Sequence, residues 1–153
     1  MKELLQAADF LRRTRRKLRQ GEHSREPLHL LRIEWKKDLV ECDWLMRAPD
    51  PWDADLPEHL ARQNQTHQAL KDALSLRDAI FDSFGAATNA DLRMYRTDAD
   101  QQLELVMTGS VSRSNEALQR VASVVMRARL CGFKFTLGSS GLESLRSISL
   151  SCT

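Results

Sequence analysis

The chain of 153 residues and 17.5 kDa fits a single domain with one hydrophobic core. Its hydrophobic content of 42% and charged content of 29% exclude disordered, collagen-like and coiled-coil classes. No apolar run is long enough to span a bilayer, and the N-terminus lacks the apolar segment and cleavage site of a signal peptide. We therefore expect a cytoplasmic protein without membrane contact.

The net charge of +2 is distributed unevenly along the chain. Residues 1–37 are strongly basic, residues 38–91 strongly acidic and residues 92–153 mildly basic. Such blocks are typical of a basic arm that meets an acidic face, in one chain or between two copies, or of a basic patch for an anionic partner. The cysteines, which include no C-x-x-C pair, indicate buried thiols in a reducing compartment: Cys42, Cys131 and Cys152.

Residues 2–20 have the periodicity of a helix that ends at Gly21. Its predicted apolar stripe is Leu4, Leu5, Ala8, Leu11 and Leu18. Its second half carries a cation cluster, which the helix dipole favours and which could also track phosphates: Arg12, Arg13, Arg15, Arg16, Lys17 and Arg19.

After Pro27 the apolar pattern changes to period two, which predicts a hairpin. A two-residue turn at Lys36-Lys37 would pair Ile33 with Val40, and Leu31 with the inward-facing Cys42. The following stretch, residues 49–57, contains three of the four prolines and is predicted to be a stiff, irregular connection. Its acidic residues and their neighbours form a candidate cation-binding or acid–base site: Glu41, Asp43, Asp50, Trp52, Asp53, Asp55, Glu58 and His59.

One long helix is predicted from Pro57 to Phe84. Its first half, residues 62–68, is polar, and we expect it to project past the sheet or to face a partner. A second hairpin is predicted over 91–112, where Gly109 suggests a bulge or a close approach by another group.

Ser114 is predicted to begin a helix that runs to Leu130, followed by a fifth strand over 133–137. Three arginines recur every seven residues and would line the outer ridge of that helix: Arg113, Arg120 and Arg127. The sequence thus predicts an α+β fold, with a mostly antiparallel five-stranded sheet of two hairpins plus a final strand, and about three helices mainly on one face. The domain is expected over 1–137, with a serine-rich tail, 138–153, docked on it or on a partner chain.

No catalytic motif, metal-binding spacing or cofactor loop occurs in the sequence, so no catalytic residue, metal or cofactor is predicted. The favoured hypothesis is a non-catalytic protein–protein interaction domain that forms a homodimer. One alternative is a nucleic-acid-binding module that uses the cation cluster and the arginine ridge. The other is an enzyme or metal-binding protein with a cleft at the acidic 41–59 region.

Overall fold

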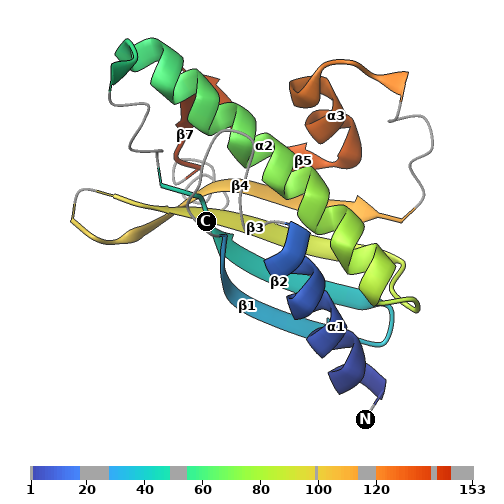
Figure 1. The fold of residues 1–153 in the computed structure, drawn as a ribbon. Helices are drawn as coiled ribbons and strands as arrows, with labels where there is room; N and C mark the ends of the chain where they lie inside the picture. The colour runs from blue at the N-terminus through green and yellow to red at the C-terminus, as the bar shows by residue number, and fades with distance from the viewer. Residues whose placement is uncertain are drawn as a thin grey trace, which may run out of the picture.

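A computed structural model describes residues 2–17, 28–48, 55–98, 100–113, 120–138 and 141–145. Three helices and a five-stranded sheet make up the main body, so the predicted α+β class is confirmed. The elements are α1 (Lys2–Lys17), β1 (His29–Lys36), β2 (Leu39–Leu45), α2 (Glu58–Ser83), β3 (Asn89–Thr97), β4 (Leu103–Ser112), α3 (Val124–Cys131), β5 (Phe133–Lys134), β6 (Thr136–Gly138) and β7 (Gly141–Glu143) (Figure 1).

The sheet has the strand order β1-β2-β3-β4-β5 and is mixed rather than wholly antiparallel. β2 and β3 are parallel, because α2 carries the chain back across the sheet between them, whereas the other neighbouring pairs are antiparallel. β6 and β7 form a separate two-stranded hairpin. The sequence predicted the two long hairpins correctly and left the mutual orientation of β2 and β3 open.

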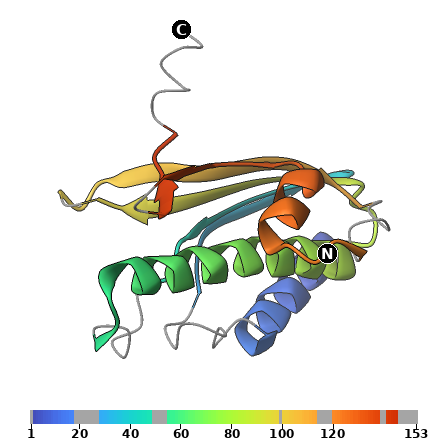
Figure 2. The same ribbon diagram turned by 90° about the horizontal axis from the view of Figure 1, so that it is seen from above.

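The described helices cover one face of the sheet, as predicted (Figure 2). The core lies between the two layers, where alternate side chains of β2 and β3 meet the C-terminal two thirds of α2. Its largest fully buried side chains include Trp44, Leu70, Leu76, Ile80, Leu92, Met94 and Met107. The inward parity predicted for Val40, Cys42 and Trp44 is confirmed.

A buried ion pair fixes α2 against the end of β2. Arg47 Nε donates to Asp72 Oδ2 at 2.7 Å, and both side chains are 2% exposed. Gln68 Nε2 donates to the other carboxylate oxygen of Asp72 at 2.9 Å. Because a buried charge is costly unless it is paired, this triad specifies how the polar half of α2 lies relative to the sheet.

The first hairpin has the predicted even-length turn, but the turn is Lys37-Asp38, one residue later than Lys36-Lys37. Ile33 therefore pairs with Cys42 rather than with Val40. The register also shifts between Leu30 and Arg32, so that Leu31 is 45% exposed instead of facing the core. The extra residue of such a bulge changes which positions face inward, so that Leu28 and Leu30 pack against the core before it and Ile33 and Trp35 after it.

In α1 the buried stripe differs from the predicted one. Ala7, Phe10 and Thr14 face inward, and the Phe10 ring lies 5.9 Å from that of Phe84 in a tilted arrangement. The predicted stripe residues Leu4, Leu5 and Leu11 are exposed instead. The predicted stripe was based on the leucines and left out Phe10, whose aromatic ring buries more surface area than a leucine side chain.

The third helix is shorter than predicted: it begins at Val124, not near Ser114. Ser123 is the N-cap, and its side chain accepts a hydrogen bond from the amide of Met126. At the other end Gly132 adopts a left-handed φ of 112°, the conformation in which glycine commonly ends a helix. Residues 114–119 lie outside the described part of the chain.

The predicted fifth strand, 133–137, is divided between β5, which joins β4, and β6, which pairs with β7. Beyond it, Leu142 and Leu145 are buried, and the amide of Leu145 donates to the carbonyl of Leu105 at 2.8 Å. Residues 141–145 of the tail therefore pack on the domain, and residues 139–140 and 146–153 lie outside the described part. Within the described helices, none is both long and apolar enough to cross a membrane.

Candidate functional site

The acidic candidate residues of β2 lie on the face of the sheet that points away from the helices, where they form ion pairs with arginines. Asp43 contacts Arg93 Nε at 3.0 Å and Arg32 Nε at 3.3 Å, and Glu41 contacts Arg32 Nη2 at 3.2 Å. Hydrogen bonds from Arg32 to Glu34, Glu41 and Asp43 raise the pKa of the guanidinium. These carboxylates therefore form part of an ionic network across β1, β2 and β3.

The remaining acidic candidates are not gathered with Glu41 and Asp43. Asp55, Glu58 and His59 lie at the exposed start of α2, on the helical side of the sheet. Asp50, Trp52 and Asp53 lie outside the described residues. Among the residues that the structure describes, no group of three or more histidine, cysteine or acidic side chains is placed to hold a metal ion.

The cation cluster of α1 is only partly described. Arg12 is exposed, and Arg13 Nε donates to Asp9 Oδ2 at 2.9 Å, one turn earlier. Arg13 and, to a smaller extent, Arg12 hold the pKa of the Asp9 carboxyl below its usual value. Arg15, Arg16 and Lys17 belong to α1, but their side chains are outside the described part, as is Arg19. Use of the cluster as a binding site stays a prediction.

The predicted arginine ridge does not exist as one helix face. Arg113 follows β4, Arg120 precedes α3, and only Arg127 lies in it. The guanidinium of Arg113 instead donates to carbonyls at the C-terminal end of α2, those of Phe81 at 2.9 Å and Phe84 at 2.8 Å, and just beyond it to that of Ala87 at 2.9 Å. The seven-residue spacing was misleading because a helix through all three positions was assumed.

The two described thiols are buried. Burial raises the pKa of Cys42 to about 12, and burial also raises the pKa of Cys131. A thiol protonated in this way is a poor nucleophile and a poor metal ligand. Cys152 lies outside the described residues.

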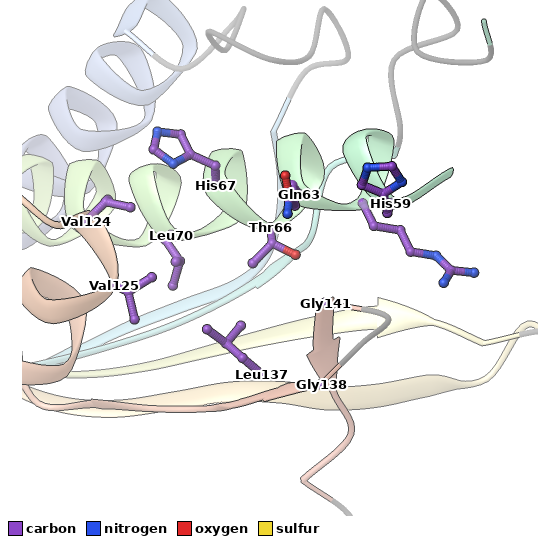
Figure 3. A pocket seen from close by; sticks show the side chains of 11 residues that line it. His59, Gln63, Thr66, His67, Leu70, Val124, Val125, Leu137, Gly138 and Gly141 are labelled. Atoms are coloured by element: carbon purple, nitrogen blue, oxygen red, sulfur yellow. The ribbon is translucent and has the colours of Figure 1, made fainter. Parts of the chain in front are cut away.

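The structure contains a pocket that the sequence did not predict, with a volume of about 400 Å³. It lies between the N-terminal half of α2, the first turn of α3 and the β6–β7 hairpin (Figure 3). Its lining is His59, Arg62, Gln63, Thr66, His67, Leu70, Val124, Val125, Leu137, Gly138 and Gly141. The volume is within the range of about 300–1,000 Å³ typical of small-molecule sites.

The polar half of α2 forms one wall of this pocket. Residues 59, 62, 63, 66 and 70 continue the helix face that is buried further along α2, at Ala73, Leu76 and Ile80. At the polar end, however, the hairpin approaches the helix without filling the space beneath it. We expected this half to project past the sheet or to face a partner, but the β6–β7 hairpin of the same chain lies against it at Thr66. Contact with a partner stays a prediction.

Gly141 sets how closely the hairpin approaches α2. A Cβ atom at this position would lie 2.5 Å from Thr66 Oγ1, and the residue has a φ of 92°. A larger residue would therefore be both strained and in steric conflict with α2. The paired Gly138 and Gly141 close the pocket from below, opposite His59 and Thr66 (Figure 3). In the sequence, the only sign of this close approach is a pair of nearby glycines in a serine-rich tail. The glycines alone do not indicate that α2 is the element they approach.

The ionisable side chains that line the pocket are all basic. The lining contains one arginine and two histidines but no aspartate or glutamate. The nearest sequence neighbour with a negative charge, Glu58, accepts a hydrogen bond from Arg62, and the two side chains are 77% and 42% exposed.

No protein family matches the chain, and no curated protein or solved structure is significantly similar to it.

Proposed function

We propose that this protein is a non-catalytic interaction domain that associates with a second copy of itself through the outer face of α1. The observation that carries the proposal is the exposure of three leucines on that helix: 62% for Leu4, 69% for Leu5 and 39% for Leu11. Soluble monomers rarely leave a contiguous group of large apolar side chains open to water.

The exposed leucines are not needed to hold α1 on the domain. That role belongs to Phe10, which is fully buried and lies against Phe84, and to Ala7 and Thr14, which are also buried. The N-terminal part of α1 extends beyond the edge of the sheet, where a partner can reach it (Figure 1). A helix with one buried face and a second apolar face is typical of an element shared between a core and an interface.

A second copy fits this face because the chain carries complementary charge. The outer side of α1 bears the exposed Arg12, followed along the helix by further cations. The outward ridge of the neighbouring α2 carries the exposed acids Asp78 and Asp82. In a twofold dimer each contact occurs twice, so that α1 of each copy can lie against the acidic ridge of α2 in the other.

The pairing of polar groups elsewhere supports a non-catalytic role. The carboxylates of Glu41 and Asp43 are held by arginines, and the thiols of Cys42 and Cys131 are buried. Groups held in this way stabilise a fold rather than meet a substrate.

The test is the molar mass in solution, measured by light scattering after size exclusion, for the unaltered protein and three variants. Leu4→Gln/Leu5→Gln removes exposed apolar area without touching the core and is expected to give monomers. Asp78→Lys/Asp82→Lys is expected to weaken the dimer by charge repulsion with the cations of α1. Leu130→Gln, on the exposed face of α3, is the matched control and should leave the dimer intact, since Leu130 is 56% exposed like the α1 leucines.

A dimer that persists in Leu4→Gln/Leu5→Gln would overturn the assignment of the interface to α1. Nucleic acid in the peak at low salt, lost at high salt and absent after Arg12→Gln/Arg13→Gln, would favour the nucleic-acid hypothesis instead.

A further inference from the structure

The pocket beneath α2 is polarised along its length. Leu70, Val124 and Val125 lie together at one end, and His59 lies at the other (Figure 3). Leu70 is 1% exposed, so the apolar end is continuous with the core. Arg62 and His59 belong to the first two turns of α2, at the opposite end. A ligand that uses the whole pocket must therefore be apolar at one end and polar at the other.

The polar end favours an anion. Its ionisable side chains are those of Arg62 and His59, and no acidic side chain is part of the lining. The acids beside the lining are Glu58, which is paired with Arg62, and Glu143, whose carboxylate lies next to Gly138. The planar guanidinium of arginine matches a carboxylate with two parallel hydrogen bonds, whereas Gln63 and Thr66 can donate to it but carry no charge. An ammonium group at this end would be repelled by the guanidinium of Arg62, which already pairs with the neighbouring acid Glu58.

We propose that the pocket binds a small carboxylic acid with an apolar chain, with its carboxylate at Arg62 and its chain against Leu70, Val125 and Leu137. The inference does not depend on self-association, because the pocket lies on the α3 side of α2 and α1 is not part of its lining. A volume of about 400 Å³ is near the lower end of the range of small-molecule sites, which fits a chain of medium length.

The ion pair between Arg62 and Glu58 competes with such a ligand without blocking it. The two residues are one helical turn apart and substantially exposed. Exposed pairs of this type contribute only about 0–1 kcal/mol, so a ligand carboxylate can take the place of Glu58. Removal of the Glu58 charge should therefore strengthen binding.

The experiment is isothermal titration calorimetry of the full chain with octanoate, octan-1-ol and acetate. Octanol keeps the chain and lacks the charge, whereas acetate keeps the charge and lacks the chain. Octanoate is expected to bind at least about tenfold more tightly than either, because only octanoate satisfies both ends of the pocket. Equal binding of octanoate and octanol would overturn the assignment of the anion site, and no heat with octanoate would overturn the proposal as a whole.

Four single variants localise the effect. Arg62→Gln should weaken octanoate binding about tenfold and leave octanol unchanged, since a charged hydrogen bond is replaced by a neutral one. Leu137→Asn should weaken both. Glu58→Gln should tighten octanoate binding about two- to threefold, because it removes the competing acid. Arg120→Gln, outside the pocket, is the matched control for loss of one positive charge.

Retained octanoate affinity in Arg62→Gln, or equal losses in Arg62→Gln and Arg120→Gln, would show that the pocket does not hold the carboxylate. Thermal unfolding of each variant confirms that the folded state is intact. The dimer measurement is separate from this one, so that failure of either proposal can be recognised independently.

Discussion

Cys42 shows how one buried side chain makes stability depend on pH. Burial raises its pKa to about 12, whereas a thiol in an unfolded chain titrates near 8.5. Below the unfolded pKa both states hold the proton. As the pH rises above that value, the unfolded state loses the proton and the native state keeps it, so the free energy of unfolding falls.

Because lysines and other groups titrate in the same range, the test compares the protein with Cys42→Ala. The variant should be less stable near neutral pH because it loses buried volume. The difference in unfolding free energy should then narrow by about 1–2 kcal/mol between about pH 8 and 10, as only the unaltered protein has a Cys42 thiol to ionise. Urea denaturation at each pH measures this difference. A difference that is constant with pH would show that Cys42 is not held protonated.

Gly109 illustrates a position where the absence of a side chain is required by packing. A Cβ atom there would lie 2.7 Å from Cδ1 of Phe133 and 3.2 Å from its Cα, so the predicted close approach by another group is confirmed. Gly109→Ala is expected to reduce the free energy of unfolding by about 1–3 kcal/mol, because Phe133 and β5 must move.

Gly85 is the matched control for that substitution. No heavy atom outside its immediate neighbours would lie within 4 Å of an added Cβ, and its φ is outside the left-handed region. Gly85→Ala should be neutral or slightly stabilising, since it restricts the unfolded chain. Denaturant midpoints that fall equally in both variants would contradict the packing argument.

At the scale of secondary-structure elements, Arg113 serves as a distant cap for α2. The last turn of α2 contains no basic residue of its own, and the helix ends at Phe84. The last carbonyls of a helix have no partner within the helix itself. Arg113 reaches these carbonyls from the end of β4, and its guanidinium also lies 5.0 Å from the centroid of the Phe81 ring. The contact ties the end of the longest helix to the sheet.

Arg113→Gln should therefore destabilise the protein by about 1–2 kcal/mol, because several carbonyls lose a charged donor. Arg120→Gln should change the stability by less than about 0.5 kcal/mol, since Arg120 is exposed. Thermal or urea unfolding of both variants distinguishes a structural arginine from a surface one. Equal and small changes in the free energy of unfolding of both variants would show that Arg113 is not a structural residue. Arg113 would then again be a candidate ligand-binding residue.

The existence and type of most elements could be predicted because each has a strong period. The alternation around Val40, Cys42 and Trp44 predicted β2, and the α2 boundaries were correct to within a residue at each end. Boundaries set by single contacts could not be predicted in this way. The start of α3 depends on which serine accepts the Met126 amide, and the turn at Lys37-Asp38 depends on a lysine with a positive φ of 32°.

At the scale of the whole molecule, the residues of a candidate site come together only if they lie on the same face of the sheet. Glu41 and Asp43 are close in sequence to Glu58 and His59, yet the sheet separates the two pairs. Conversely, Thr66 and Gly141 are 75 positions apart and come into close approach at the pocket. Long-range juxtaposition of this kind leaves no periodic signal, which is why the pocket could not be predicted. For the same reason the sequence did not show that Glu41 and Asp43 lie apart from Glu58 and His59.

The most direct test of self-association is the molar mass of the unaltered protein in solution, measured at low and at high salt. A dimer would have a mass near twice the chain mass of 17.5 kDa, and we expect no nucleic acid in the peak. The dimer should persist at high salt, because salt screens the charges of α1 and α2 but not the burial of the leucines. A monomer at all concentrations and salt conditions, with Leu4 and Leu5 still exposed to water, would contradict self-association through α1.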